Sequence, residues 1–132
     1  MSARQPYQAY QKNSVETASG PQLTLMLYNG CVKFIHQGIK AMEQEQFEAK
    51  NIAIQKAQSI IQELMLTLDQ EAEISQQMLP LYEFIHYQLQ QGNMKNNVES
   101  MEEALHLVNE FRDTWKEAMK QQITPSKQGA RA

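Results

Sequence analysis

Apolar residues recur every three or four positions between residues 22 and 121, which is the spacing of amphipathic α-helices. Breaks in the pattern and residues typical of turns divide this region into four segments. We predict helices over residues 22–44, 46–69, 74–91 and 97–121. No segment shows the alternation of a strand. The short links between the segments favour an all-α fold, an antiparallel four-helix bundle.

Turn residues and caps define the ends of the later helices. Gly92-Asn93 is expected to end the third helix, and either Asn96 or Asn97 to cap the fourth. Pro80 lies inside the third segment, where it removes a backbone hydrogen bond. Two alternatives follow: the helix proper starts near Leu79, or it continues through the proline with a kink.

The last three helices each show one line of apolar positions that we expect to face the core. These positions are Phe47, Ile54, Ala57, Ile61, Leu64 and Leu68 in the second helix, Ile74, Met78, Leu81, Tyr82, Ile85 and Leu89 in the third, and Val98, Met101, Leu105, Val108, Phe111 and Trp115 in the fourth.

The first helix differs because it carries two apolar stripes side by side. A surface helix normally has one stripe about 100° wide, so this helix needs partners on two sides. It is either central to the bundle or the floor of a groove that receives another polypeptide. One stripe holds Leu23, Leu27, Gly30, Phe34, Gly38 and Ala41, and the other holds Leu25, Tyr28, Val32, Ile35, Ile39 and Met42.

Composition indicates one domain in the cytoplasm. The 132 residues suffice for a bundle, residues 22–122, between an N-terminal arm, residues 1–21, and a tail, residues 123–132, that we expect to be disordered. The start lacks the apolar stretch of a secretory signal, and no uncharged run reaches the roughly 18 residues of a membrane span. The single cysteine, Cys31, cannot form an internal disulfide. A net charge of −3 with scattered basic residues argues against nucleic-acid binding.

Two Glu-x-x-His motifs, Glu83–His86 and Glu103–His106, match the spacing found in di-iron carboxylate bundles. Their direction does not fit, because the glutamates point about 160° and the histidines about 100° away from the predicted core centre. The first helix also offers no glutamate that faces the core. We interpret both motifs as solvated polar faces and expect no metal and no other cofactor.

His36 lies on the polar arc of the first helix, where a histidine-phosphotransfer domain would carry its phosphoacceptor. Such domains have the order His-x-x-Lys-Gly, whereas here Gly38 precedes Lys40. The sequence also lacks a glycine-rich phosphate loop and a nucleophile placed beside a base. Phosphotransfer through His36 is therefore the alternative function, and we expect a protein without catalytic activity.

Two helical surfaces are candidates for binding another polypeptide. One is the double stripe of the first helix, where Gly30 allows a backbone to approach closely and where packing inside the bundle is an equal alternative. The other is the back of the second helix. There Ile52, Ser59 and Leu66 form an outward seam a heptad apart, and scattered exposed aliphatic residues are an equal alternative.

The arm is the third candidate surface. Tyr7, Tyr10 and Val15 are spaced like a short amphipathic turn in an otherwise polar segment that runs to the helix-breaking pair Gly20-Pro21. An arm of this kind could cover an apolar groove and be displaced by a partner.

Residues 6–35, PYQAYQKNSVETASGPQLTLMLYNGCVKFI, closely resemble the N-terminal signature of the flagellin export chaperones, the FliS family. That signature has paired tyrosines, an Asn-x-Val-x-Thr segment, a Leu-x-x-Met-Leu-Tyr-x-Gly stretch and then Lys-Phe-Ile. The resemblance continues through KAQSIIQELMLTLDQE and FRDTWKEA and leaves only the tail unmatched. Pro80 and the histidine motifs depart from the family's pattern.

The resemblance implies a cytosolic bundle that binds the C-terminal region of flagellin, prevents its premature polymerisation and delivers it to the type III export gate at the membrane. It also implies that the arm lies, through Tyr10, over part of the client site. Together with the surfaces above, it gives the candidate partner-binding residues, which are Tyr7, Tyr10, Asn13, Val15, Met26, Leu27, Gly30, Phe34, Ile52 and Leu66.

Overall fold

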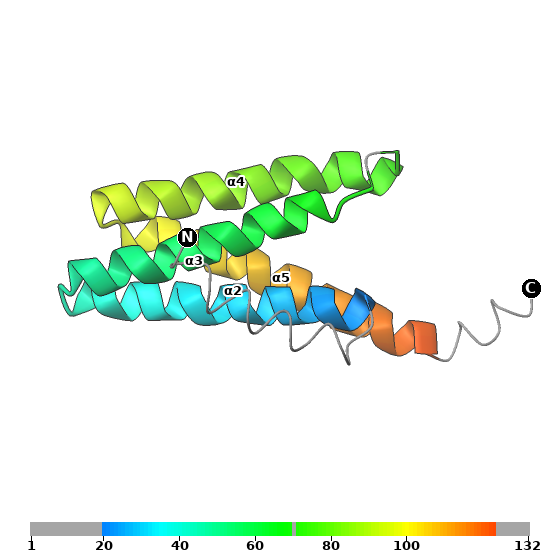
Figure 1. Cartoon of the computed structure of the whole chain (residues 1–132), viewed down its shortest axis with the longest axis horizontal. Coiled ribbons are helices and arrows are strands. Elements are labelled where there is room, and N and C mark those ends of the chain that lie inside the picture. The colour runs from blue at the N-terminus through cyan, green and yellow to red at the C-terminus, as the bar shows by residue number, and fades with distance from the viewer. Residues whose placement is uncertain (1–19, 70, 124–132) are drawn as a thin grey trace, which may run out of the picture.

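A computed structural model describes residues 20–69 and 71–123, which form four helices joined by short links (Figure 1). Consecutive helices run in opposite directions, and each packs against two neighbours in a ring, because α5 returns to α2. The predicted all-α four-helix bundle is confirmed, and the described residues include no strand. The helices are α2 (Gly20–Glu43), α3 (Phe47–Leu66), α4 (Glu73–Lys95) and α5 (Val98–Ile123).

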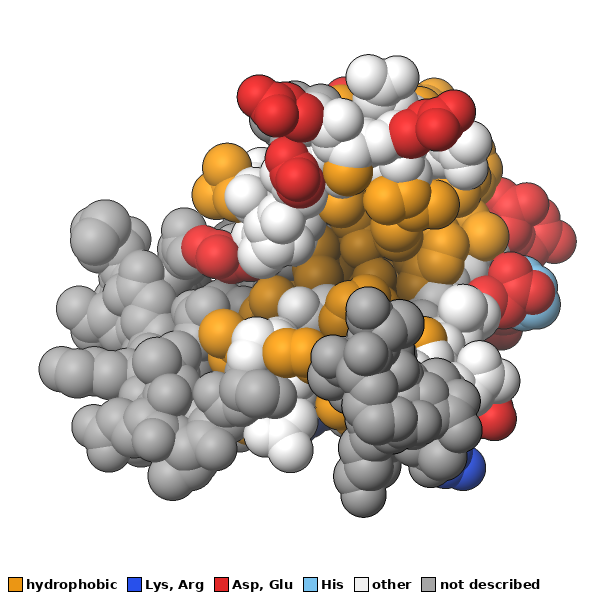
Figure 2. Space-filling view, turned by 90° about the vertical axis from the view of Figure 1, so that its right-hand side faces the viewer, with side chains coloured by type: hydrophobic (Ala, Val, Ile, Leu, Met, Phe, Trp, Pro, Cys, Tyr) orange, Lys and Arg blue, Asp and Glu red, His pale blue; other side chains and the backbone are white. Residues whose placement is uncertain are grey.

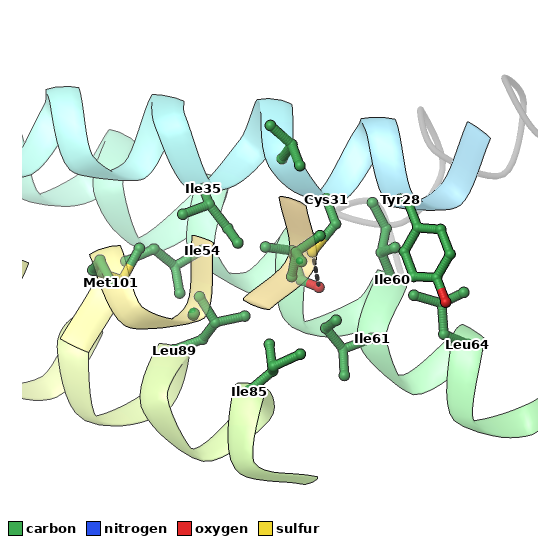
Figure 3. Close-up of a cluster of buried hydrophobic side chains, with 14 of the residues drawn as sticks. Tyr28, Cys31, Ile35, Ile54, Ile60, Ile61, Leu64, Ile85, Leu89 and Met101 are labelled. Carbon is green, nitrogen blue, oxygen red and sulfur yellow. Dashed lines mark hydrogen bonds between the residues drawn. The ribbon is translucent and has the colours of Figure 1, made fainter. Parts of the chain in front are cut away.

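The core explains the two apolar stripes of α2. This helix packs against α3 on one side and α5 on the other, so both stripes have partners inside the bundle. Leu27 and Ala41 of the first stripe and Tyr28 and Ile35 of the second are all buried. Figure 3 shows α2 side chains pointing into the same cluster as those of α3, α4 and α5. Of the two alternatives, the central element is therefore the one that the structure adopts.

The α4–α5 turn corrects the predicted end of the third helix. The stop at Gly92-Asn93 is wrong, because α4 continues to Lys95. Asn96 then adopts the left-handed conformation, with φ 51°, that closes the helix. Asn97 is the cap of α5, since its Oδ1 accepts hydrogen bonds from the backbone N–H groups of Glu99 and Ser100. The two asparagines thus cap different helices.

The start of α4 and the end of α3 also differ from the predicted bounds. α4 begins at Glu73 and passes through Pro80 as one helix, so it does not start near Leu79. The proline ring faces solvent, where the carbonyl that lost its helical partner can be hydrated. α3 ends at Leu66 rather than residue 69.

Three residues assigned to the core lines are exposed. Phe47, Ile74 and Leu81 expose 48%, 59% and 41% of their surface, respectively. Phe47 is the first residue of α3, beyond the reach of the opposite helices. Ile74 and Leu81 lie in the first turns of α4, where that helix stands away from α2 and α5 (Figure 1). The periodicity correctly places Ile74 and Leu81 on the apolar side of α4. At this end of α4, none of the described helices covers these two side chains.

The helices pack tightly at the end that contains the links 44–46 and 96–97, which we call the closed end. A Cβ on Gly38 would stand 2.8 Å from Ile54 Cγ1, and one on Gly92 would stand 2.7 Å from Met101 Sδ. The buried Lys50 ties α3 to the same end. Its Nζ donates to the carbonyl oxygen of Asn93 at 2.8 Å and to Asn96 Oδ1 at 2.6 Å.

None of the helices in the described ranges is long and apolar enough to cross a membrane.

Candidate interaction site

At the opposite end, which we call the open end, α3 and α4 separate from α2 and α5 (Figure 1). Figure 2 shows this end from outside: the surface is hollowed, and hydrophobic side chains form the floor of the hollow. The helix segments that meet here carry apolar side chains that are half-buried or exposed. We call this hollow, together with the apolar side chains of the surrounding segments, the end cleft; these side chains are Leu68, Ile74, Met78, Leu81, Phe111 and Trp115.

Four aromatic residues from α2, α4 and α5 form one cluster of contacting rings. The Phe111 ring of α5 lies 6.4 Å from the Tyr28 ring of α2 and 5.6 Å from the Tyr82 ring of α4, measured between centroids. The Trp115 ring lies 6.5 Å from Tyr28 with its edge toward it. Such tilted and edge-to-face contacts are the favoured geometries of aromatic pairs.

Trp115 also fixes the start of α2. Its Nε1–H donates to the carbonyl oxygen of Pro21 at 2.9 Å, across 94 positions of sequence. Pro21 lies in the first turn of α2, so this bond holds the beginning of α2 against the second half of α5. This bond joins α2 to α5 at the open end, whereas α4 contacts the same side through Tyr82, whose ring packs on Phe111 and whose hydroxyl bonds to that of Tyr28.

Tyr28 and Tyr82 form a buried polar pair within this aromatic cluster. Their hydroxyl oxygens lie 2.6 Å apart, and each residue exposes 2% of its surface. Burial is the main cause that raises the pKa of both phenols above the ordinary value, so both stay protonated. Burial likewise raises the pKa of the Cys31 thiol one turn along α2, which makes it an inert core group.

The candidate residues of α2 take part mainly in packing. Leu27 is buried in the core, and a Cβ on Gly30 would stand 3.3 Å from Ile60 Cδ1. Gly30 therefore allows α3, rather than a foreign backbone, to approach. Met26 and Phe34 are half-buried, and the Phe34 ring lies 5.3 Å from Lys56 Nζ. The positions of Leu27 and Gly30 do not favour direct contact with a partner.

The seam on α3 faces outward. Ile52 exposes 45% and Leu66 79% of its surface, while Ser59 between them is half-buried. The buried residues of the helix lie on the other side. Leu66 is the last residue of α3, so one end of the seam reaches the open end. Tyr7, Tyr10, Asn13 and Val15 of the arm lie outside the described residues.

The histidine motifs lie in two shallow surface depressions. Glu103 and His106 line one between α4 and α5, over Phe84, and His106 Nε2 lies 3.1 Å from Glu110 Oε2. Glu83 and His86 line another between α3 and α4. Within the part of the chain that the structure describes, no three potential metal ligands gather. His36 is exposed on α2.

Sequence reasoning did not assign the end cleft as a site. The apolar periodicity predicts that Ile74, Leu81, Phe111 and Trp115 all face the core. The sequence offers no clear signal for the end cleft, because the long link at 67–72 appears only in the structure, where α3 ends at Leu66. The two tyrosines come together from positions 54 residues apart, which periodicity does not predict.

Comparison with known proteins gives a consistent result along nearly the whole chain. Residues 3–122 match the family described as flagellar protein FliS. The chain is 46% identical over 119 residues to a flagellar secretion chaperone FliS of Bacillus subtilis, covering 90% of each chain. It is 32% identical to the flagellar secretion chaperone FliS of Escherichia coli, covering 96% of each, and 34% identical to that of Salmonella typhimurium, covering 83% and 86%. The chain belongs to the FliS family of flagellar secretion chaperones.

Proposed function

We propose that the protein binds the C-terminal segment of flagellin in the cytoplasm, keeps it from polymerising and delivers it to the flagellar type III export apparatus. Its family is one of secretion chaperones and not of enzymes, which already gives an export-chaperone role. The proposal adds the identity of the client, the mode of binding and the destination.

The observation that carries the proposal is the end cleft. A domain of this size can bury its large apolar side chains, yet Ile74 and Leu81 of α4 stay exposed and Phe111 and Trp115 of α5 are only half-buried. Exposed apolar surface of this extent is typical of a site that another polypeptide covers. An amphipathic helix fits such a hollow, because its apolar stripe can complete the missing layer of the open end.

Binding of this kind explains how polymerisation would be prevented. A flagellin segment that assembles into a filament uses its apolar face to pack against neighbouring subunits. The end cleft offers that face a competing surface, so the bound segment is unavailable to its neighbours. Ordering a flexible client opposes binding, so affinity depends on the buried area and on several anchor contacts.

Titration calorimetry with a peptide of flagellin's C-terminal region tests the proposal. We expect one-to-one binding whose enthalpy becomes more negative with rising temperature, because burial of apolar surface gives a negative heat-capacity change. A peptide with the same composition in scrambled order is the control. Absence of binding, or a temperature-independent enthalpy, would reject the client or the apolar mechanism. Co-sedimentation of the loaded chaperone with export-gate protein tests delivery separately.

A further inference from the structure

The hydroxyl pair of Tyr28 and Tyr82 holds one more hydrogen than it can use. Each phenol carries one O–H, but a bond between the two oxygens consumes only one of these hydrogens. Among the described residues neither hydroxyl has a second partner. One O–H group of the pair is therefore a buried donor without an acceptor among the residues that the structure describes, although buried polar groups are nearly always satisfied.

This spare donor lies immediately behind the end cleft. Phe111 is half-buried, contacts both tyrosine rings and belongs to the cleft. Figure 3 shows the Tyr28 side chain pointing from α2 toward Leu64, which lies in the last turn of α3 at the open end. Tyr82 is carried by α4, the helix whose first turns stand apart. Because each tyrosine exposes only 2% of its surface, a client reaches the hydroxyls only when Phe111 shifts or α4 moves outward, and our proposal includes this movement.

We propose that the Tyr28–Tyr82 hydroxyl pair is a polar anchor for the client, and that its spare O–H donates to a neutral oxygen of the bound segment. The acceptor is a main-chain carbonyl or a side-chain amide oxygen. This inference rests on the proposed function, since it places one hydrogen bond within the apolar interface of the end cleft. The apolar end cleft by itself favours any client with enough apolar surface. The hydrogen bond adds a second requirement, because the client must also place an acceptor oxygen next to the hydroxyl pair.

The surroundings of the pair select a neutral acceptor rather than a carboxylate. Ile61, Leu64 and the rings of Phe111 and Trp115 supply apolar atoms, and no described residue places a cation beside the hydroxyls. A carboxylate brought here would lose its hydration without gaining a counter-charge. A cation is excluded by the same argument and by the raised pKa of both phenols, which keeps them from ionising to phenolates.

Phenylalanine variants distinguish an anchor from a purely structural pair. Tyr28→Phe or Tyr82→Phe alone leaves one hydroxyl, whose O–H is then free to donate to the client. Each single variant should lower the melting temperature, because the remaining hydroxyl loses its partner, but should bind the client peptide within about twofold of the natural chain. The double variant removes both hydroxyls while keeping both rings. It should melt near the natural chain and bind about tenfold more weakly.

Calorimetry with the flagellin C-terminal peptide measures these affinities, and circular dichroism checks that every variant is folded. Tyr87→Phe is the matched control, because Tyr87 is an exposed tyrosine of α4. The affinity of this variant for the peptide should equal that of the natural chain. A double variant that binds as well as the natural chain would overturn the anchor and leave the proposed function intact. A natural chain that does not bind the peptide would reject the proposed function and the anchor with it.

Discussion

Met101 of α5 occupies the space that a side chain on Gly92 of α4 would need. A Cβ at position 92 would stand 2.7 Å from Met101 Sδ and 2.8 Å from its Cγ, and Met101 is completely buried. Glycine in a helix normally lowers stability, so its presence in the last turn of α4 requires a reason. The reason is close packing of α4 on α5 at the closed end, because the Met101 side chain lies directly against the backbone of Gly92.

Gly92→Ala should therefore destabilise the bundle despite the better helix propensity of alanine. Overpacking of a filled core outweighs the propensity gain, and we expect a net loss of about 1–2 kcal/mol in the free energy of unfolding. Urea unfolding followed by circular dichroism measures it. Gly20→Ala is the control, because nothing lies within 4 Å of a Cβ at that position. Equal stability of the two variants would contradict the contact with Met101.

Lys50→Met should also loosen the closed end. The methionine keeps the apolar stem, but the carbonyl of Asn93 and the Oδ1 of Asn96 lose their shared donor. Loss of charged hydrogen bonds of this kind is expected to lower stability by about 1–3 kcal/mol. Lys116→Met, at an exposed position of α5, removes the same charge without a buried contact and should leave stability nearly unchanged. Chemical denaturation of both variants checks the difference.

The seam on α3 can be tested apart from the end cleft. If Ile52 and Leu66 contact the client, Leu66→Glu should weaken binding of the flagellin peptide by about tenfold. The melting temperature should hardly change, because Leu66 exposes 79% of its surface and supports little of the core. Gln76→Glu adds the same charge at an exposed position of α4 and serves as the control. Unchanged affinity of Leu66→Glu would limit the client to other surfaces.

The arm supplies a further prediction about affinity. We expect Tyr10→Ala to weaken client binding, because a tyrosine that docks on the bound client contributes apolar area and a polar tip. If the arm only covered the site in the free protein, the same change would raise affinity, since the competent state would be populated more fully. Removal of residues 1–11 is the companion measurement. No change in affinity on that deletion would exclude the arm from binding.

His86 predicts a small dependence of stability on pH. Partial burial lowers the pKa of this imidazole below its ordinary value near 6.5, so the folded state binds fewer protons than the unfolded state as the solution is acidified. The contribution of His86 to the free energy of unfolding is fully present above the pKa of the unfolded state. It is lost as pH falls through the lowered pKa of the folded state. The unfolding midpoint should therefore fall less in His86→Gln than in the natural chain between pH 7.5 and 5.5. His36→Gln, at an exposed position, is the control.

The number, order and approximate extent of the helices follow from the sequence, because each apolar face repeats over several turns. Local signals were less reliable at helix ends. Gly92 has the composition of a helix stop, but its lack of a side chain serves the contact with Met101, and the stop lies at Asn96. A pattern read along one helix does not reveal what an opposite helix requires at a given position.

The sequence by itself determined the bundle, its outward seam at Ile52 and Leu66 and its resemblance to a chaperone family, since these depend on helical phase and on motifs. Tertiary structure alone decided which apolar faces are covered. It placed Leu27 in the core, left Ile74 and Leu81 at an open end, and joined Tyr28 to Tyr82 across 54 positions. The physical reason is that burial depends on the angle between helices, and that angle arises from contacts between residues far apart in the chain.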